Sequence, residues 1–292
     1  MKILRRILIG LVALIVLLLV TIYALSAMRL NRTYDVSVAP LSVSPANADT
    51  AEGHRWAAMR GCTQCHGENL GGTQFADDFP FGRVGAPNIT RGRGSPTAAY
   101  ADSDWVRAVR HGINREGKPL FIMPSHEYNG LSDRDLSAVI AYVRSAPPID
   151  SALPPRRLGP VARALVGFGA MPLAAALIDH GARPTPPPPG ATMEYGRYLV
   201  GMCTPCHGQN LGGLTPGGHG PPPGPNITKG GALAAYTKEA FARAIRTGQA
   251  PTRPLNGELM PWPAFSRLTD DEVEALWMYI SSVAPVTAAV RE

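Results

Sequence analysis

The sequence predicts an all-α protein in which one apolar N-terminal helix precedes two copies of a small helical domain. Three observations lead to this fold class: an uncharged apolar stretch at residues 7–25, an internal repeat, and an amphipathic helical pattern that closes each copy. Strand-like alternation of apolar and polar residues is scarce in both copies. The chain has 292 residues, which suits two domains.

The apolar stretch has the length of a membrane span. At about 1.5 Å per residue, residues 7–25 match a hydrocarbon thickness of about 30 Å. Lys2, Arg5 and Arg6 precede the stretch, so the positive-inside rule keeps the N-terminus in the cytoplasm. The alternative is a signal peptide cleaved near residues 24–26, although the stretch exceeds a usual signal core. Either way, we expect the remainder in the periplasm of a bacterium, tethered to the inner membrane if the helix is retained.

One unit of sequence occurs twice. Each copy holds a C-x-x-C-H string, then G-x-N-L-G-G, then P-N-I-T, then an arginine on a helical segment, then Met-Pro. These features begin at Cys62, Gly67, Pro87, Arg110 and Met123, and again at Cys203, Gly208, Pro225, Arg246 and Met260. The offset falls from 141 to 136 residues and ends at 137, as expected for small deletions in a duplicated domain. We therefore expect an anchor (1–30), an extended linker (31–49), a first domain (50–150), a second linker (151–190) and a second domain (191–292).

Each copy is predicted to contain three main helices: one before C-x-x-C-H, one in the middle and one at the end. Residues 132–135 and 269–272 resemble capping boxes that start the last helix. Apolar residues then follow at i, i+3, i+4 and i+7, beginning at Leu136 and at Val273. Tyr142 and Tyr279 occupy one repeat position, and we expect them to be packing residues.

The two C-x-x-C-H strings, residues 62–66 and 203–207, carry the chemistry. Two cysteines three apart can each form a thioether to a haem vinyl group, and the next histidine can ligate the iron. The strings use all four cysteines of the chain, so none is left for a disulfide. A zinc site or a redox dithiol is the alternative, but neither needs the trailing histidine. The sequence predicts two covalently bound haem c groups, held by Cys62, Cys65, His66, Cys203, Cys206 and His207.

The second axial ligand of each iron is predicted to be a methionine. Met123 and Met260 lie at one repeat position, in a loop before the last helix, and a proline follows each. The competing histidines lack a counterpart in the other copy: His54, His111, His126, His180 and His219. The repeated P-N-I-T string supplies candidates for supporting contacts (Pro87, Asn88, Pro225, Asn226), since a proline carbonyl there could accept the proton on the histidine's other nitrogen. The alternative is that the string only forms a turn.

These motifs together resemble the class I cytochrome c domain. The likeness covers roughly residues 50–150 and 191–288 and is greatest to the membrane-anchored cytochrome c subunits that accompany periplasmic dehydrogenases for alcohols, aldehydes and gluconate. The resemblance implies two tandem class I cytochrome c domains, with thioether cysteines, proximal histidines and distal methionines at the matched positions. Those subunits typically carry three haem motifs and this chain has two, so their partners and substrates do not transfer.

Charge is concentrated outside the two repeats. The net charge is +6, and residues 1–49 and 151–190 contribute +3 each, whereas both predicted domains are neutral. The positive net charge therefore gives no reason to expect that the protein binds nucleic acid. Within the second linker, residues 158–180 are apolar and are expected to pack on the haem domains or to lie at the membrane interface. Residues 184–189 are proline-rich and suggest a semi-rigid spacer.

The sequence favours a membrane-tethered dihaem cytochrome c that carries single electrons and has no small-molecule substrate of its own. The expected donor is a dehydrogenase or a quinol-oxidising complex, and the expected acceptor is a soluble cytochrome or an oxidase. One alternative is a dihaem peroxidase-like oxidoreductase, which would need a replaceable sixth ligand and an acid/base residue such as His126 or Glu127. The other is a haem-bearing structural subunit of a respiratory or photosynthetic complex, which shares every sequence feature with the carrier.

Overall fold

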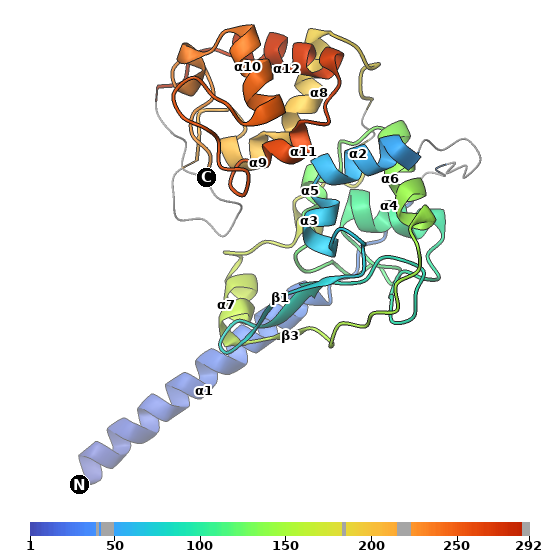
Figure 1. Ribbon diagram of the computed structural model, residues 1–292. Coiled ribbons are helices and arrows are strands. Elements are labelled where there is room, and N and C mark those ends of the chain that lie inside the picture. Colours follow the sequence, from blue (N-terminus) through green and yellow to red (C-terminus); the bar gives the residue numbers. More distant parts are fainter. Residues whose placement is uncertain (39–40, 42–49, 183–184, 215–222, 288–292) are drawn as a thin grey trace. The chain divides into compact units, whose positions relative to one another are not determined.

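The structure is a computed structural model that describes residues 1–38, 41, 50–182, 185–214 and 223–287. The chain forms two compact units, one made of Met1–Gly53, Cys62–Asn129 and Asp133–Ala182, the other of His54–Gly61, Gly130–Ser132 and Arg183–Glu292. Most secondary structure in the described residues is helical (Figure 1), which confirms the all-α prediction.

The N-terminal apolar stretch forms one long helix, α1 (Lys2–Leu30). Most of its apolar side chains are exposed, and only Ile22 and Ser26, near its C-terminal end, are buried. Among the described residues, α1 is the one helix long and apolar enough to cross a membrane. A helix of this length with an exposed apolar surface fits a transmembrane anchor, and an N-terminal signal sequence has the same length and composition.

The first repeat contains the expected helices and two short ones. They are α2 (Thr50–Met59), α3 (Cys62–His66), α4 (Asp102–His111), α5 (Ser125–Tyr128) and α6 (Asp133–Ser145). The predicted apolar face of α6 is buried. Gly53 of α2 lies so close to α6 that a Cβ there would be 2.1 Å from the Ala138 carbonyl oxygen and 2.7 Å from Tyr142 Cβ. Tyr142 therefore packs where the first helix meets the last.

A small antiparallel sheet, absent from the prediction, follows the first C-x-x-C-H motif. Strand β1 (Thr73–Asp78) pairs with β2 (Gly82–Ala86), and β2 pairs with β3 (Arg157–Leu158) in the second linker. Most β1 side chains are exposed, so β1 has no buried face. Its sequence therefore lacks the alternation of apolar and polar residues that predicts a half-buried strand. Strand β3, which pairs with β2, lies about seventy residues further along the chain, and periodicity does not detect a pairing over that distance.

The second repeat folds in the same order. Its elements are α8 (Met193–Leu199), η2 (Val200–Met202), α9 (Thr204–His207), η3 (Ala232–Ala235), α10 (Lys238–Thr247), α11 (Trp262–Phe265) and α12 (Asp270–Ser282). Thr269 and Glu272 form the predicted capping box of α12. A Cβ on Gly196 of α8 would lie 2.0 Å from the Ala275 carbonyl oxygen and 2.9 Å from Tyr279 Cβ. Each repeat thus joins its first and last helices through a glycine and a tyrosine.

The apolar part of the second linker forms α7 (Pro160–Phe168) and the short η1 (Ala174–Ala176). Nine residues at about 1.5 Å each are too short to span a bilayer. Helix α7 packs beside α1 and contributes Ala162 and Val166 to a cluster with Val84 of the sheet, and it leaves Val161 and Phe168 exposed. Of the proline-rich spacer, Pro184 lies outside the described residues.

Candidate haem sites

Each C-x-x-C-H string occupies one helical turn. Cys62, Cys65 and His66 lie on one face of helix α3, because residues three and four apart are neighbours on a helix. The second string does the same with Cys203 at the N-cap of α9. None of the four cysteines forms a disulfide bond. Both pairs are therefore available for thioether bonds on the same side of the turn as the histidine.

Both histidines are buried and hydrogen-bonded through the same ring nitrogen. His66 Nδ1 lies 2.8 Å from the Pro87 carbonyl oxygen, and His207 Nδ1 lies 2.7 Å from the Pro225 carbonyl oxygen. A carbonyl only accepts, so Nδ1 carries the proton and Nε2 keeps the lone pair that a metal requires. Burial lowers the pKa of both rings, and the proline carbonyl partly opposes that shift. Each ring is held neutral and oriented, as an iron ligand needs to be.

The rest of P-N-I-T ties this loop to the chain beyond the last helix. Asn88 Nδ2 donates to the Ile149 carbonyl (2.6 Å), and its Oδ1 accepts from the backbone and hydroxyl of Thr90. In the second repeat Asn226 Nδ2 donates to the Val286 carbonyl (2.6 Å) and accepts from Thr228 in the same way. The string therefore forms a turn and also aims its proline carbonyl at the histidine.

The G-x-N-L-G-G string contributes a contact that the sequence reasoning did not assign. Leu70 and Leu211 adopt left-handed backbone conformations, with φ of 60° and 59°. The Leu70 carbonyl accepts from the Ile89 amide, and the Leu211 carbonyl accepts from the Ile227 amide, both at 2.9 Å. A left-handed backbone conformation costs free energy for a leucine. Because it occurs at the same position in both repeats, we infer that the path of this loop requires it. The repetition of the string was the available signal.

The two Met-Pro pairs fold alike. Pro124 has φ −82° and ψ 55°, and Pro261 has φ −75° and ψ 55°. The residue after each proline donates its amide to the methionine carbonyl, at 2.9 Å for Met123 and 2.6 Å for Met260. This is the geometry of an inverse γ-turn centred on the proline. Both methionines are half-buried at the start of a one-turn helix, so the two repeats present them from equivalent backbone positions.

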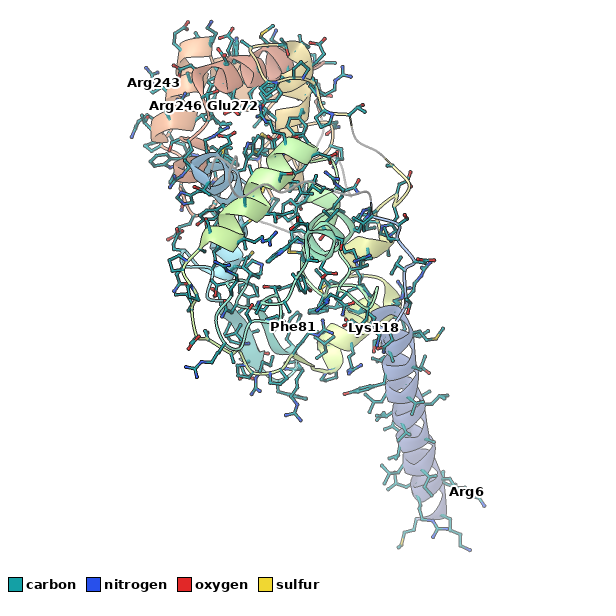
Figure 2. All side chains as sticks on the ribbon, turned by 90° about the vertical axis from the view of Figure 1, so that its right-hand side faces the viewer. Arg6, Phe81, Lys118, Arg243, Arg246 and Glu272 are labelled. Atoms are coloured by element: carbon teal, nitrogen blue, oxygen red, sulfur yellow. The ribbon has the colours of Figure 1, made fainter. Side chains whose placement is uncertain are left out.

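A repeated arginine joins the middle helix to the start of the last helix. Arg110 Nη1 lies 2.8 Å from Asp133 Oδ1, and Arg246 Nη2 lies 2.6 Å from Asp270 Oδ1. Arg246, labelled in Figure 2, also donates to the carbonyls of Ser266 and Leu268. These bonds fix the segment between the methionine turn and the last helix.

Of the competing histidines, His111 and His180 lie against each other. His111 Nδ1 lies 3.1 Å from His180 Nδ1, and His180 Nε2 lies 3.0 Å from the Ala175 carbonyl oxygen. His126, next to the methionine turn, has its Nε2 4.0 Å from Glu127 Oε1 and is partly exposed. His219 lies outside the described residues.

The zinc alternative finds no support in the part of the chain that the structure describes, where no group of three or more His, Cys, Asp or Glu side chains could hold a metal ion. Burial raises the pKa of the Cys203 thiol to about 12. By contrast, a cysteine pair on one turn and a buried neutral histidine with a free Nε2 fit covalent haem. The residues present therefore suit haem c in both repeats.

Comparison with known proteins agrees with this geometry. The family model described as Cytochrome c matches residues 50–147 and 193–284, which together make up more than half of the chain. The chain is 31% identical over 196 residues to a nicotinate dehydrogenase subunit of Pseudomonas putida, covering 62% of this chain and 16% of that relative.

Two further relatives are named as cytochrome subunits. The fructose dehydrogenase cytochrome subunit of Gluconobacter japonicus is 28% identical over 144 residues, which cover 46% of this chain and 30% of the relative. The cytochrome c subunit of alcohol dehydrogenase (quinone) from Gluconacetobacter polyoxogenes is 22% identical over 295 residues, which cover 88% of this chain and 62% of the relative. Each match thus spans less than two thirds of the relative's own length. On the strength of the family match over both repeats, the chain belongs to the cytochrome c family, whose domains carry covalently bound haem c.

Proposed function

We propose that this protein is a membrane-tethered dihaem cytochrome c that passes single electrons between redox proteins outside the cytoplasm. The observation that carries the proposal is the duplicated site, in which both C-x-x-C-H histidines are buried and donate from Nδ1 to the proline carbonyl of P-N-I-T. Haem c supplies a one-electron iron couple when bound. The residues that would hold it are Cys62, Cys65, His66 and Met123 in one site, and Cys203, Cys206, His207 and Met260 in the other.

The surrounding residues keep each site rigid. The Pro87 and Pro225 carbonyls orient the ligating rings, while Asn88 and Asn226 anchor their loops to the end of the domain. The two methionines are proposed as the second axial ligands, since thioether ligation raises the iron potential relative to a second histidine. A site closed on both faces suits electron transfer and leaves no position for a substrate.

The partner class follows from the relatives. They are named as subunits of nicotinate, fructose and alcohol dehydrogenases, so we infer a dehydrogenase as the electron donor. A quinol-oxidising complex is the alternative donor, and a soluble cytochrome or an oxidase is the inferred acceptor. Both predicted haem domains are neutral, which favours docking through apolar surface more than through electrostatic steering.

Packing within the first unit supports retention of α1 as an uncleaved anchor. Ser26 is fully buried, and its Oγ accepts a hydrogen bond from Arg163 Nη1 (3.1 Å). A Cβ on Gly167 of α7 would lie 3.3 Å from both the Ile22 carbonyl oxygen and the Ser26 amide nitrogen. Cleavage near residues 24–26 would remove this contact from α7. If α1 is retained, the protein stays in the membrane fraction after carbonate extraction and its N-terminal peptide is found by mass spectrometry.

A redox titration followed by visible spectroscopy, with carbon monoxide added to the reduced protein, tests the electron-transfer function. Two low-spin haems with fairly positive potentials that do not bind carbon monoxide would establish two closed His/Met sites. A haem that is high-spin or reacts with carbon monoxide would contradict the proposal and favour peroxidase-like chemistry instead.

A further inference from the structure

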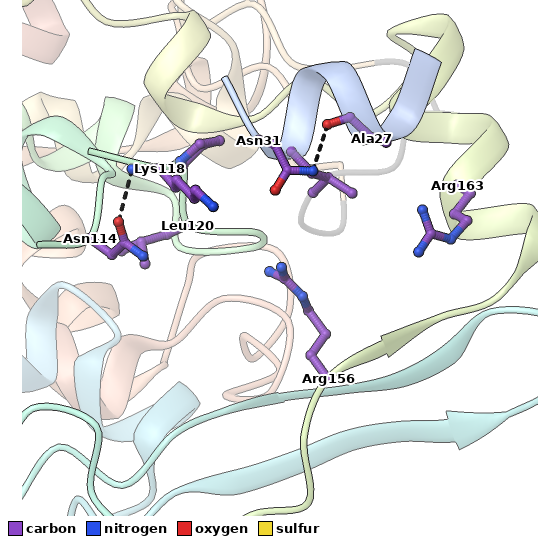
Figure 3. Close-up of a pocket in the computed structure, with 9 residues that line it drawn as sticks. Ala27, Asn31, Asn114, Lys118, Leu120, Arg156 and Arg163 are labelled. Atoms are coloured by element: carbon purple, nitrogen blue, oxygen red, sulfur yellow. Dashed lines mark hydrogen bonds between the residues drawn. The ribbon is translucent and has the colours of Figure 1, made fainter. Parts of the chain in front are cut away.

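A cavity of about 350 Å³ opens beside the C-terminal end of α1. Figure 3 shows its walls: Ala27 and Asn31 come from α1, Asn114 and Lys118 from the loop after α4, and Arg156 and Arg163 from the second linker. All of these belong to the first compact unit. We refer to it as the α1 cavity.

The α1 cavity is cationic. Lys118, Arg156 and Arg163 line it, and no carboxylate is among its described lining residues. These three side chains form no ion pair with any residue that the structure describes. Unpaired positive charge gathered in one cavity is unfavourable, and an anion placed there would relieve it.

The two arginines are also partly removed from water. Arg163 Nε is buried without a hydrogen-bond partner, while its guanidinium lies 4.5 Å from the Tyr23 ring centroid. Arg156 stays exposed along part of its length, with its guanidinium 5.3 Å from the Phe121 ring centroid. Desolvation, and then the nearby charge of Arg163, lower the pKa of Arg156. A buried donor without a partner is expensive, which again favours an acceptor in the cavity.

The position of the cavity along α1 points to the source of that anion. If residues 7–25 cross the hydrocarbon layer, Asn31 lies about 9 Å beyond it along the helix, in the head-group region. Figure 2 shows Lys118 beside the C-terminal end of α1 and Arg6 at the opposite end. Nearby apolar side chains are exposed: Phe79 of the hairpin at 85% and Phe168 of α7 at 58%. Exposed apolar groups beside a membrane helix are typical of a surface that contacts lipid.

We propose that the α1 cavity binds the phosphate of an anionic phospholipid head group at the outer face of the membrane. Arginine guanidinium groups suit this ligand because they present paired donors to phosphate oxygens. The amides of Asn31 and Asn114 line the same cavity and provide polar groups for the remainder of the head group. This inference rests on the proposed membrane anchoring of α1.

The test is native mass spectrometry of the full-length holoprotein in detergent, titrated with phosphatidylglycerol, phosphatidylcholine or inorganic phosphate. We expect selective binding of phosphatidylglycerol, weakened about fivefold by Arg156→Gln or by Lys118→Gln, and about 25-fold by both together. Arg156→Lys keeps the charge but loses the paired donors, so it should weaken binding less than Arg156→Gln does. Arg157→Gln is the matched control, because it removes the same charge one residue away and does not line the cavity. Unchanged haem absorbance shows that each variant is folded.

Other outcomes contradict the inference in distinguishable ways. Equal binding of phosphatidylglycerol by all variants, with α1 present in the intact mass, would overturn the lipid site and leave the anchor standing. Inorganic phosphate that binds without lipid and displaces phosphatidylglycerol at equal concentration would overturn the lipid as the source. An intact mass that lacks residues 1–26 would overturn the anchor, and the lipid site with it.

Discussion

Replacement of Gly196 by alanine tests the helix crossing that closes the second haem domain. The added Cβ would lie 2.0 Å from the Ala275 carbonyl oxygen, 2.7 Å from its carbonyl carbon and 2.9 Å from Tyr279 Cβ. Ordinary contact begins near 3.4 Å, so α8 must move away from α12 by more than an ångström or the backbone must distort. Overpacking of this kind costs about 1–3 kcal/mol, with larger values when backbone is the obstacle.

Alanine also favours a helix over glycine by about 1 kcal/mol, which offsets part of the clash. The obstacle here is backbone and not the end of a flexible side chain, so we expect a net loss of about 2 kcal/mol. For a domain of this size, that loss lowers the melting temperature by roughly 8–16 °C. The assay is thermal unfolding of the holoprotein, followed by circular dichroism and by the visible haem band.

The chain supplies its own controls for this experiment. Gly53→Ala places a Cβ 2.1 Å from the Ala138 carbonyl oxygen and should destabilise the first domain in the same way. In Gly201→Ala the added Cβ would have no neighbouring atom within 4 Å, so this variant should have the melting temperature of the wild type. If Gly196→Ala melts at the same temperature as Gly201→Ala, the close crossing of α8 and α12 is not present in the protein and the reasoning is refuted.

Three further predictions concern the haem sites. Met123→His and Met260→His should each lower the potential of one haem by on the order of 0.1 V in a redox titration and leave the other unchanged; a silent substitution removes that methionine from the site. Asn226→Ala removes the bond to the Val286 carbonyl and two bonds from Thr228, so it should cost about 1–3 kcal/mol in denaturant unfolding. An exposed replacement in the same domain, Gln249→Ala, serves as its comparison. Cys203→Ser combined with Cys206→Ser should halve the haem content by pyridine haemochrome assay; full content would contradict covalent attachment there.

The sequence determined the features that depend on local spacing. The C-x-x-C-H strings predict their chemistry because thioether attachment and iron ligation need those residues within one helical turn. The apolar stretch at residues 7–25 predicts α1 because its length matches a bilayer. The amphipathic pattern from Leu136 predicts α6, since the helical period alone decides which residues share a face. The internal repeat predicted two domains of one fold, and the family match over both regions agrees.

Only the tertiary structure decided which distant residues meet. The P-N-I-T string predicted a proline carbonyl that accepts from the histidine, but a simple turn was an open alternative, and only the path of the folded chain shows the Pro87 carbonyl oxygen 2.8 Å from His66 Nδ1. The pairing of β2 with Arg157–Leu158 and the packing of α7 on α1 are likewise contacts across long stretches of sequence. Periodicity reports which face of an element is apolar and not which partner covers that face. For this reason the α1 cavity, whose charged walls come from the loop after α4 and from the second linker, could be found only in the folded chain.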